Sequence, residues 1–180
     1  SPGRSGRALA VPNGLVHHWR GSVFIPGITL DDVLAHVANP TARNTAQEDV
    51  LDTRVLERGP GMLRLFLRLQ RSQVVTVVYD TEHAIHYARH GRTRASSTSV
   101  ATRIVEVANA GTSSERARPA GQDRGFLWRL NSYWRYEQTE DGVIVECESI
   151  SLSRTVPSLL ASTLRPLVDQ MARSSMARTL

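Results

Sequence analysis

The segment spanning residues 123–154 constrains the fold of this chain more than any other. It consists of two stretches with strand-like alternation, separated by Asp141-Gly142. Aspartate and glycine tolerate the positive φ that a two-residue turn requires, so this segment predicts an antiparallel hairpin. Because side chains alternate along a strand, the hairpin has one aromatic face and one charged face. We interpret it as one wall of a cavity.

The two faces of this hairpin differ in what burial would cost them. The aromatic face carries Phe126, Trp128, Leu130, Ser132, Trp134, Tyr136, Val143, Val145, Cys147, Ser149, Ser151 and Ser153. The other face carries Arg129, Arg135, Glu146 and Glu148. Burying an unpaired arginine or glutamate is costly, whereas tryptophan, leucine, valine and cysteine gain from leaving water. We therefore expect the aromatic face to point inward. The reverse orientation would place an Arg/Asn/Tyr/Glu network inside the cavity.

The rest of the chain shows more strands and one change of period. Alternation predicts strands at residues 15–25, 50–58, 62–70, 74–89 and 95–107, and residues 108–122 are predicted to form an exposed loop. Thr29 is a good N-cap, with Asp31 and Asp32 favoured in the first turn by the helix dipole. We expect that helix to end at Asn39-Pro40, and a second short helix at 42–48. From Val156 onward, apolar residues including Leu164 recur at helical spacing and predict one long helix, kinked at Pro166.

Length and composition limit the class of protein. A chain of 180 residues is most simply one domain. We expect residues 1–14, rich in Gly, Pro, Ser and Arg, to form a flexible tail, and residues 15–180 to form that domain. All 22 basic residues are arginines spread along the chain without a basic stripe, so we expect no nucleic-acid partner. No apolar run has the length of a transmembrane helix, so no integral membrane segment is expected.

Metal and cofactor sites are not expected. The single cysteine excludes an intramolecular disulfide and a cysteine-based metal site. His17 and His18 are adjacent on one strand and therefore point to opposite faces, as do His83 and His86. No metal-ligand spacing emerges from the histidines, and no cofactor motif is present.

Four stretches carry a resemblance to a known family. HHWRGSVFIPG, TEHAIHY, GFLWRLNSYWRY and VECESISLSR resemble a bacterial branch of the START/SRPBCC superfamily, the birch-pollen-allergen-like proteins that include aromatic polyketide cyclases. The resemblance covers residues 15–180. It implies an α+β helix-grip fold: a seven-stranded curved antiparallel sheet wrapped around a long C-terminal helix, with two short helices between the first two strands. It also implies an apolar cavity between the sheet and that helix.

The resemblance implies a ligand site as well. Cyclases line the cavity with residues of the last two strands, which correspond here to Leu130, Ser132, Trp134, Tyr136, Val145, Cys147 and Ser149. With Trp19, Trp128 and Leu164, these are the predicted ligand-binding residues. The arginine that cyclases place inside the cavity on a middle strand has no counterpart at residues 74–79.

Each candidate also has a structural interpretation. The tryptophans could be core residues, and the serines could bond to nearby backbone. His17 shares a face with Trp19 and could be an acid–base group or a structural histidine. Cys147 is expected to be buried and unreactive. Glu106 is expected to be an exposed sheet charge, or to pair with an arginine of the first hairpin strand.

Two functions follow from this sequence. The first is a module that binds or carries a hydrophobic or aromatic small molecule or a lipid in the internal cavity. The alternative is a polyketide cyclase- or dehydratase-like enzyme that uses the same cavity, although no catalytic signature is present. Similar bacterial sequences often carry an N-terminal export segment, which favours a periplasmic or exported location over the cytoplasm. The ligand and the oligomeric state stay open.

Overall fold

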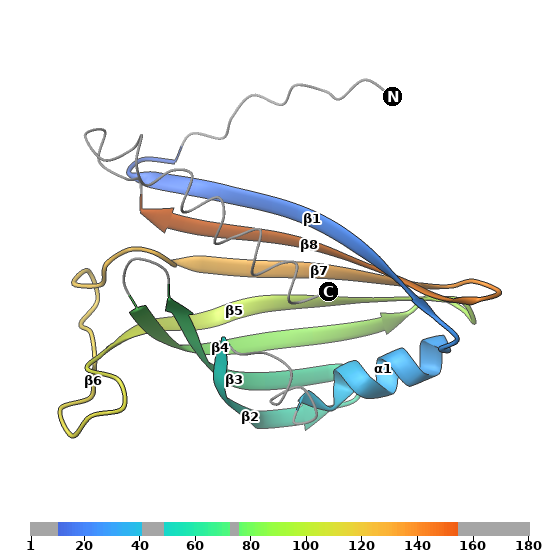
Figure 1. Cartoon of the computed structure of the whole chain (residues 1–180), viewed down its shortest axis with the longest axis horizontal. Coiled ribbons are helices and arrows are strands. Elements are labelled where there is room, and N and C mark those ends of the chain that lie inside the picture. The colour runs from blue at the N-terminus through green and yellow to red at the C-terminus, as the bar shows by residue number, and fades with distance from the viewer. Residues whose placement is uncertain (1–10, 41–48, 73–75, 155–180) are drawn as a thin grey trace.

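The fold is an antiparallel sheet with few helices. The computed structural model describes residues 11–40, 49–72 and 76–154. The strands are β1 (Gly14–Pro26), β2 (Val50–Gly59), β3 (Met62–Ser72), β4 (Thr76–Arg89), β5 (Arg94–Ala108), β6 (Arg116–Ala117), β7 (Arg129–Gln138) and β8 (Gly142–Arg154), and the helix is α1 (Leu30–Ala38). They form one eight-stranded sheet in the order β1-β8-β7-β5-β4-β3-β2, with the short β6 beside β5 (Figure 1).

The predicted strands are confirmed, with two corrections at the hairpin. Gly142 is the first residue of β8, and neither Asp141 nor Gly142 has the positive φ that was expected of the turn. Phe126 and Trp128 were expected on the first hairpin strand, but β7 begins at Arg129. Gly125 interrupts the extended conformation with a φ of +76°, a region that favours glycine. Trp128 then turns its indole N–H to the Asp123 carboxylate, at 3.0 Å. The predicted loop at 108–122 also contains β6, which pairs with the end of β5.

The predicted helix after Thr29 is confirmed as α1. The Thr29 hydroxyl accepts from the Asp32 amide at 3.2 Å, and the Asp32 carboxylate accepts from the Thr29 amide at 3.1 Å. This reciprocal capping box satisfies amides that a helix start otherwise leaves without partners. The second short helix at 42–48 and the long helix from Val156, including Leu164, lie outside the described residues.

α1 packs on one face of the sheet, which we call the inner face, at the end where β7 turns into β8 (Figure 1). The core there joins Leu30, Val33, Ala95, Tyr136, Val143 and Val145. Gly142 allows β1 and β8 to approach closely at this end. A Cβ on Gly142 would lie 2.2 Å from the Ile25 carbonyl oxygen, so no larger residue fits without movement of the backbone.

The opposite, outer face of the sheet carries charges of both signs. Arg20 donates to Glu146 at 3.0 Å across β1 and β8, and Arg68 donates to Asp80 at 2.7 Å across β3 and β4. Arg135 and Glu146 also lie on this face, 3.7 Å apart. The charged face of the hairpin therefore lies on the outer face, and its aromatic face lies on the side of α1. The C-terminal helix that the aromatic face was expected to meet lies outside the described residues.

Candidate functional site

The strand register brings most of the predicted site residues together on the inner face. Trp19 of β1 lies opposite Ser149 of β8, and Ser149 lies opposite Ser132 of β7. Trp134 lies opposite Cys147 in the same hairpin. Directly opposite residues of an antiparallel pair share a face, so these side chains form one continuous surface. Trp19, Ser132, Trp134 and Ser149 are half-buried, whereas Cys147 is buried.

Some of the predicted residues belong to the core. Tyr136 and Val145 are 3% and 6% exposed and pack within the cluster beneath α1. The Tyr136 hydroxyl lies 3.1 Å from the Ser97 hydroxyl. Trp134 packs against the edge of that cluster. Leu130, opposite Ser151, is half-buried on the same face.

A row of polar side chains crosses the middle of the inner face. Ser149 and Ser132 continue to Ser99 of β5, which lies opposite Ser132. The Ser99 hydroxyl is 3.3 Å from His83 Nδ1, and His83 Nε2 is 3.0 Å from the Thr81 hydroxyl. We call these five residues (Ser149, Ser132, Ser99, His83 and Thr81) the polar row. They share the inner face with the aromatic side chains Trp19 and Trp134.

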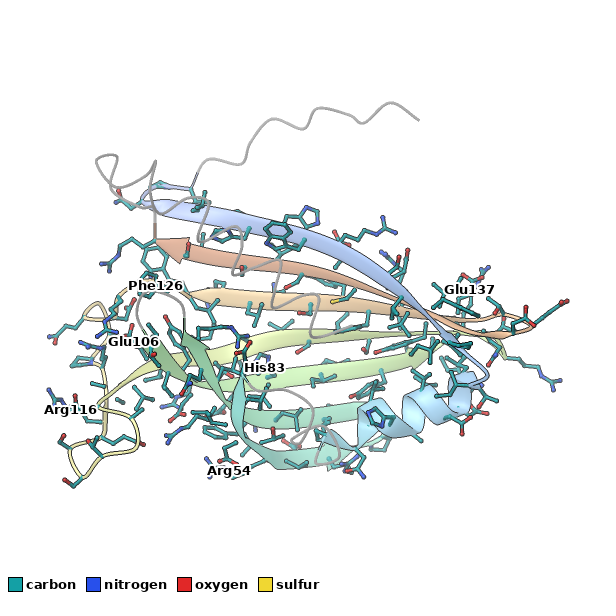
Figure 2. The ribbon with its side chains drawn as sticks, in the orientation of Figure 1. Arg54, His83, Glu106, Arg116, Phe126 and Glu137 are labelled. Atoms are coloured by element: carbon teal, nitrogen blue, oxygen red, sulfur yellow. The ribbon has the colours of Figure 1, made fainter. Side chains whose placement is uncertain are left out.

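His83 is the titratable member of the polar row. It is 5% exposed, between Leu65 of β3 and Ala101 of β5, and this burial lowers its pKa to about 4. At neutral pH the imidazole is therefore uncharged. The Thr81 hydroxyl donates to the Leu67 carbonyl at 3.0 Å, so it accepts from His83. The imidazole then carries its proton on Nε2, and Nδ1 accepts from Ser99. Figure 2 shows His83 on the central strands.

His17 lies on the same face, closer to the start of β1. It is 8% exposed, and its Nε2 atom lies 3.0 Å from the Ser153 hydroxyl. Trp128 stands apart from the other tryptophans. Its indole bonds to Asp123, and the Arg154 guanidinium lies 5.6 Å from its ring centre. Trp128 thus helps to hold the connection between β6 and β7.

Glu106 differs from the expectation of an exposed charge. It is 3% exposed, its carboxylate forms an ion pair with Arg118 Nε at 2.8 Å, and it accepts from the Arg124 amide at 2.7 Å. Neither arginine lies on β7, so the expected pairing with that strand is also wrong. A β-bulge at Glu82/His83 shifts the register of β4 and β5, and it places Glu106 opposite Tyr79 on the inner face. Burial and the nearby Glu106 carboxylate raise the pKa of Tyr79 above its ordinary value.

An open groove of about 610 Å³ lies at the end of the sheet remote from α1. Its apolar lining includes Val78 and Val107, and its charged lining includes Arg68, Arg118 and Arg124. These arginines already bond to carboxylates: Arg68 to Asp80 and Glu115, and the other two to Glu106. The groove therefore offers little uncompensated charge for an anion.

Within residues 11–40, 49–72 and 76–154, no three His, Cys, Asp or Glu side chains are placed to hold a metal ion. α1, the helix of that part of the chain, is too short and too polar to span a bilayer.

Comparison with solved structures identifies the fold. The Zhui aromatase/cyclase from Streptomyces sp. R1128 matches with a TM-score of 0.61 at 10% identity, over 92% of this chain and 90% of that one. A STAR-related lipid transfer protein from Xanthomonas axonopodis matches with a TM-score of 0.57 at 18% identity, over 87% of both chains. The fold is that of the START/SRPBCC superfamily.

The START-fold relatives include longer chains. The di-domain aromatase/cyclase StfQ of the steffimycin pathway matches over 92% of this chain with a TM-score of 0.56 at 13% identity, and this chain spans 48% of it. No family model matches the sequence, and no curated protein matches it. The similarity between this chain and the solved structures therefore lies in the fold.

Sequence reasoning missed part of the polar row. His83, Thr81 and Ser99 were not chosen, although all three share the inner face with Ser132 and Ser149. A signal was present in the run Ser96–Ser99, where four consecutive hydroxyl residues occupy a predicted strand. His83 was considered only as a metal ligand, and its pairing with hydroxyls depends on strand register.

Proposed function

We propose that this protein binds a hydrophobic or aromatic small molecule, or a lipid, on the inner face of its sheet. The observation that carries the proposal is the polar row, because a core made only for stability seldom lines up half-buried hydroxyls between tryptophans. Trp19 and Trp134 supply apolar area, and Ser99, Ser132 and Ser149 offer hydrogen bonds to ligand oxygens.

The START-fold neighbours support this class of ligand. One is named as a lipid transfer protein and others as aromatase/cyclases. Burial of an apolar or polycyclic guest against tryptophan would provide most of the affinity. The hydroxyls would select among guests by the position of their oxygen atoms, because a buried hydroxyl without a partner is costly.

Native mass spectrometry of the protein purified from its source tests the proposal directly. We expect a co-purifying lipid or aromatic compound, released on denaturation. Titration with a hydrophobic fluorescent probe then locates the site. The double variant Ser132→Ala/Ser149→Ala should weaken binding about fivefold, because each lost hydrogen bond is worth about 0.5–1.5 kcal/mol. The control Ser22→Ala removes an exposed hydroxyl from the outer face, opposite Glu146, and should change nothing. If the double variant and Ser22→Ala changed probe affinity equally, the ligand would not bind at Ser132 and Ser149.

A cyclase- or dehydratase-like activity is the second candidate, and His83 is the observation that favours it. A buried, neutral imidazole next to two hydroxyls can accept a proton from a carbonyl compound and return it. Ser132 would orient a substrate carbonyl nearby. The test compares His83→Gln with the unchanged protein on a polyketide mimic. Loss of turnover with unchanged probe affinity supports catalysis, and unchanged turnover excludes His83 as the proton-transfer group.

A further inference from the structure

An exposed phenylalanine with arginines on both sides of it in the sequence marks the end of the sheet remote from α1. Phe126 is 48% exposed, in the connection that leads into β7. Arg124 and Arg129 flank it in sequence, and Arg154 contacts the adjoining backbone. Figure 2 shows Phe126 and Arg116 at this end of the molecule, far from Glu137 near the β7–β8 turn. We call Phe126, Arg116, Arg124, Arg129 and Arg154 the arginine rim.

Hydrogen bonds on both sides hold Phe126 at the surface. The Arg154 amide donates to the Gly125 carbonyl at 2.6 Å, and the Trp128 amide donates to the Leu152 carbonyl at 2.7 Å. A Cβ on Gly125 would lie 2.6 Å from the Arg154 side chain, so this contact depends on glycine. Phe126 thus lies between Gly125 and Trp128, whose backbone groups are both hydrogen-bonded to β8.

The rim carries positive charge that its own carboxylates do not cancel. Residues 106–129 together with Arg154 contain five arginines and three carboxylates, a net formal charge of +2. The carboxylates are engaged: Glu106 by Arg118, Glu115 by Arg68, and Asp123 by the Trp128 indole. Arg116 and Arg129 are exposed and form no ion pair with any residue that the structure describes.

A second exposed phenylalanine shows what is special about the rim. Phe24 is 47% exposed and lies opposite Ile144 on the outer face. The charged side chains nearby in the register are already paired, Arg20 with Glu146 and Arg94 with Glu137. Phe24 therefore sits among neutralised pairs, whereas Phe126 sits among arginines in excess.

We propose that the arginine rim docks on an anionic phospholipid surface, with Phe126 in the interfacial layer and Arg116, Arg129 and Arg154 at the headgroups. Aromatic rings favour the headgroup level of a bilayer. Clustered basic residues are attracted to anionic lipids. This goes beyond the proposed function, because it concerns where the protein meets a bilayer and not which molecule it holds.

Vesicle co-sedimentation of the full chain tests the docking surface. Vesicles of pure phosphatidylcholine are compared with vesicles of phosphatidylcholine mixed with phosphatidylglycerol, with the same acyl chains, at low and high salt. We expect binding to the mixed vesicles alone, weakened by salt. Both vesicle types contain lipids with the same acyl chains, so binding of an acyl chain on the inner face would occur with both. Only docking of the arginine rim depends on the anionic headgroup. The experiment therefore distinguishes failure of the docking proposal from failure of the proposed ligand binding.

Matched variants locate the contact. Phe126→Ala and Arg129→Gln should each weaken binding to mixed vesicles about fivefold. Phe126→Trp should preserve it, which separates loss of an anchor from damage to the connection. Phe24→Ala is the control and should bind like the unchanged protein. Three results would overturn the proposal: equal binding to both vesicle types, binding to neither type, or an equal loss of binding in Phe24→Ala and Phe126→Ala. If the protein binds neither type of vesicle, an acidic protein becomes the partner to test.

Discussion

The two halves of the inner face have the same strands but different chemistry. Beneath α1, Leu30, Tyr136 and Val143 are 2%, 3% and 0% exposed and pack as an apolar core. A few residues farther along the same strands, Ser132 and Ser149 are half-buried and polar. Along β7 and β8, the apolar core thus ends and a half-buried polar surface that could contact a ligand begins. Tyr136 and Ser132 were predicted for one site and share a face, but Tyr136 is buried in the core and Ser132 is half-buried beyond it.

Substitution in the core half should produce the largest loss of stability. Leu30→Ala removes a buried side chain that packs in one cluster with Tyr136 of β7 and Val143 of β8, and it leaves a cavity. We expect the free energy of unfolding to fall by about 2–5 kcal/mol in urea titrations. The affinity for a hydrophobic probe, measured where the variant is folded, should stay the same. A loss of affinity in the folded variant would mean that the two halves are not separate.

The pH dependence of stability should report on His83. Its pKa of about 4 in the folded protein lies below the 6.5 of the unfolded chain. As the pH falls below 6.5, the unfolded chain gains a proton that the folded protein does not, so the free energy of unfolding decreases until about pH 4. The total loss is at most about 3 kcal/mol, and above pH 6.5 His83 has no effect.

Substitutions distinguish the contribution of His83 to the pH dependence of stability from that of the other histidines. Urea unfolding at neutral pH and within the acidic window should show a smaller pH-dependent loss in His83→Gln than in the unchanged protein. His86→Gln changes an exposed histidine of the opposite face and should behave like the unchanged protein. An identical loss in all three proteins would show that His83 is not buried and neutral.

Trp134 lies at the boundary between the two halves, and its replacement should affect both. Trp134→Ala removes packing at the edge of the core cluster, so stability should fall by about 2 kcal/mol. Probe affinity should fall as well, because Trp134 also shares the inner face with Ser132 of the polar row, two residues away on β7. If stability falls while affinity is unchanged, Trp134 belongs to the core and the boundary moves toward Ser132.

The smallest effect is expected on the outer face. Arg135 is 57% exposed, and its guanidinium lies 3.7 Å from a Glu146 carboxylate that Arg20 also contacts. Arg135→Ala should change the free energy of unfolding by less than about 0.5 kcal/mol and leave probe affinity unchanged. Loss of probe binding in a folded Arg135→Ala protein would place the ligand on the outer face.

Local signals predicted the strands and α1 because the physics there is local. The Thr29 cap and the alternation of β3 each follow from neighbouring residues. The hairpin lies where Asp141-Gly142 predicted it, although neither of these residues has a positive φ. The orientation of the hairpin also followed from the cost of burying Arg135 and Glu146. The antiparallel START-type sheet is thus confirmed, whereas the ligand remains a prediction.

Long-range contacts explain what the sequence did not predict. Glu106 was expected to be exposed, but a bulge near His83 turns it toward Arg118 and Arg124 across a connection of many residues. The hydrogen bonds of His83 likewise require that β4 and β5 pair in one register. Register and bulges depend on the packing of the whole sheet, and no local pattern encodes them.

The place of β1 has a consequence for how this protein is made. β1 is an outermost strand whose ladder runs along β8, so that Gly14 pairs with Arg154 and Pro26 with Gly142. During synthesis, β1 leaves the ribosome well before β8 and must wait for β8 before it gains this neighbour. Such distant pairing slows folding and keeps apolar side chains such as Val23 and Ile25 uncovered in the nascent chain. A chaperone that binds extended apolar segments would therefore find its target in β1.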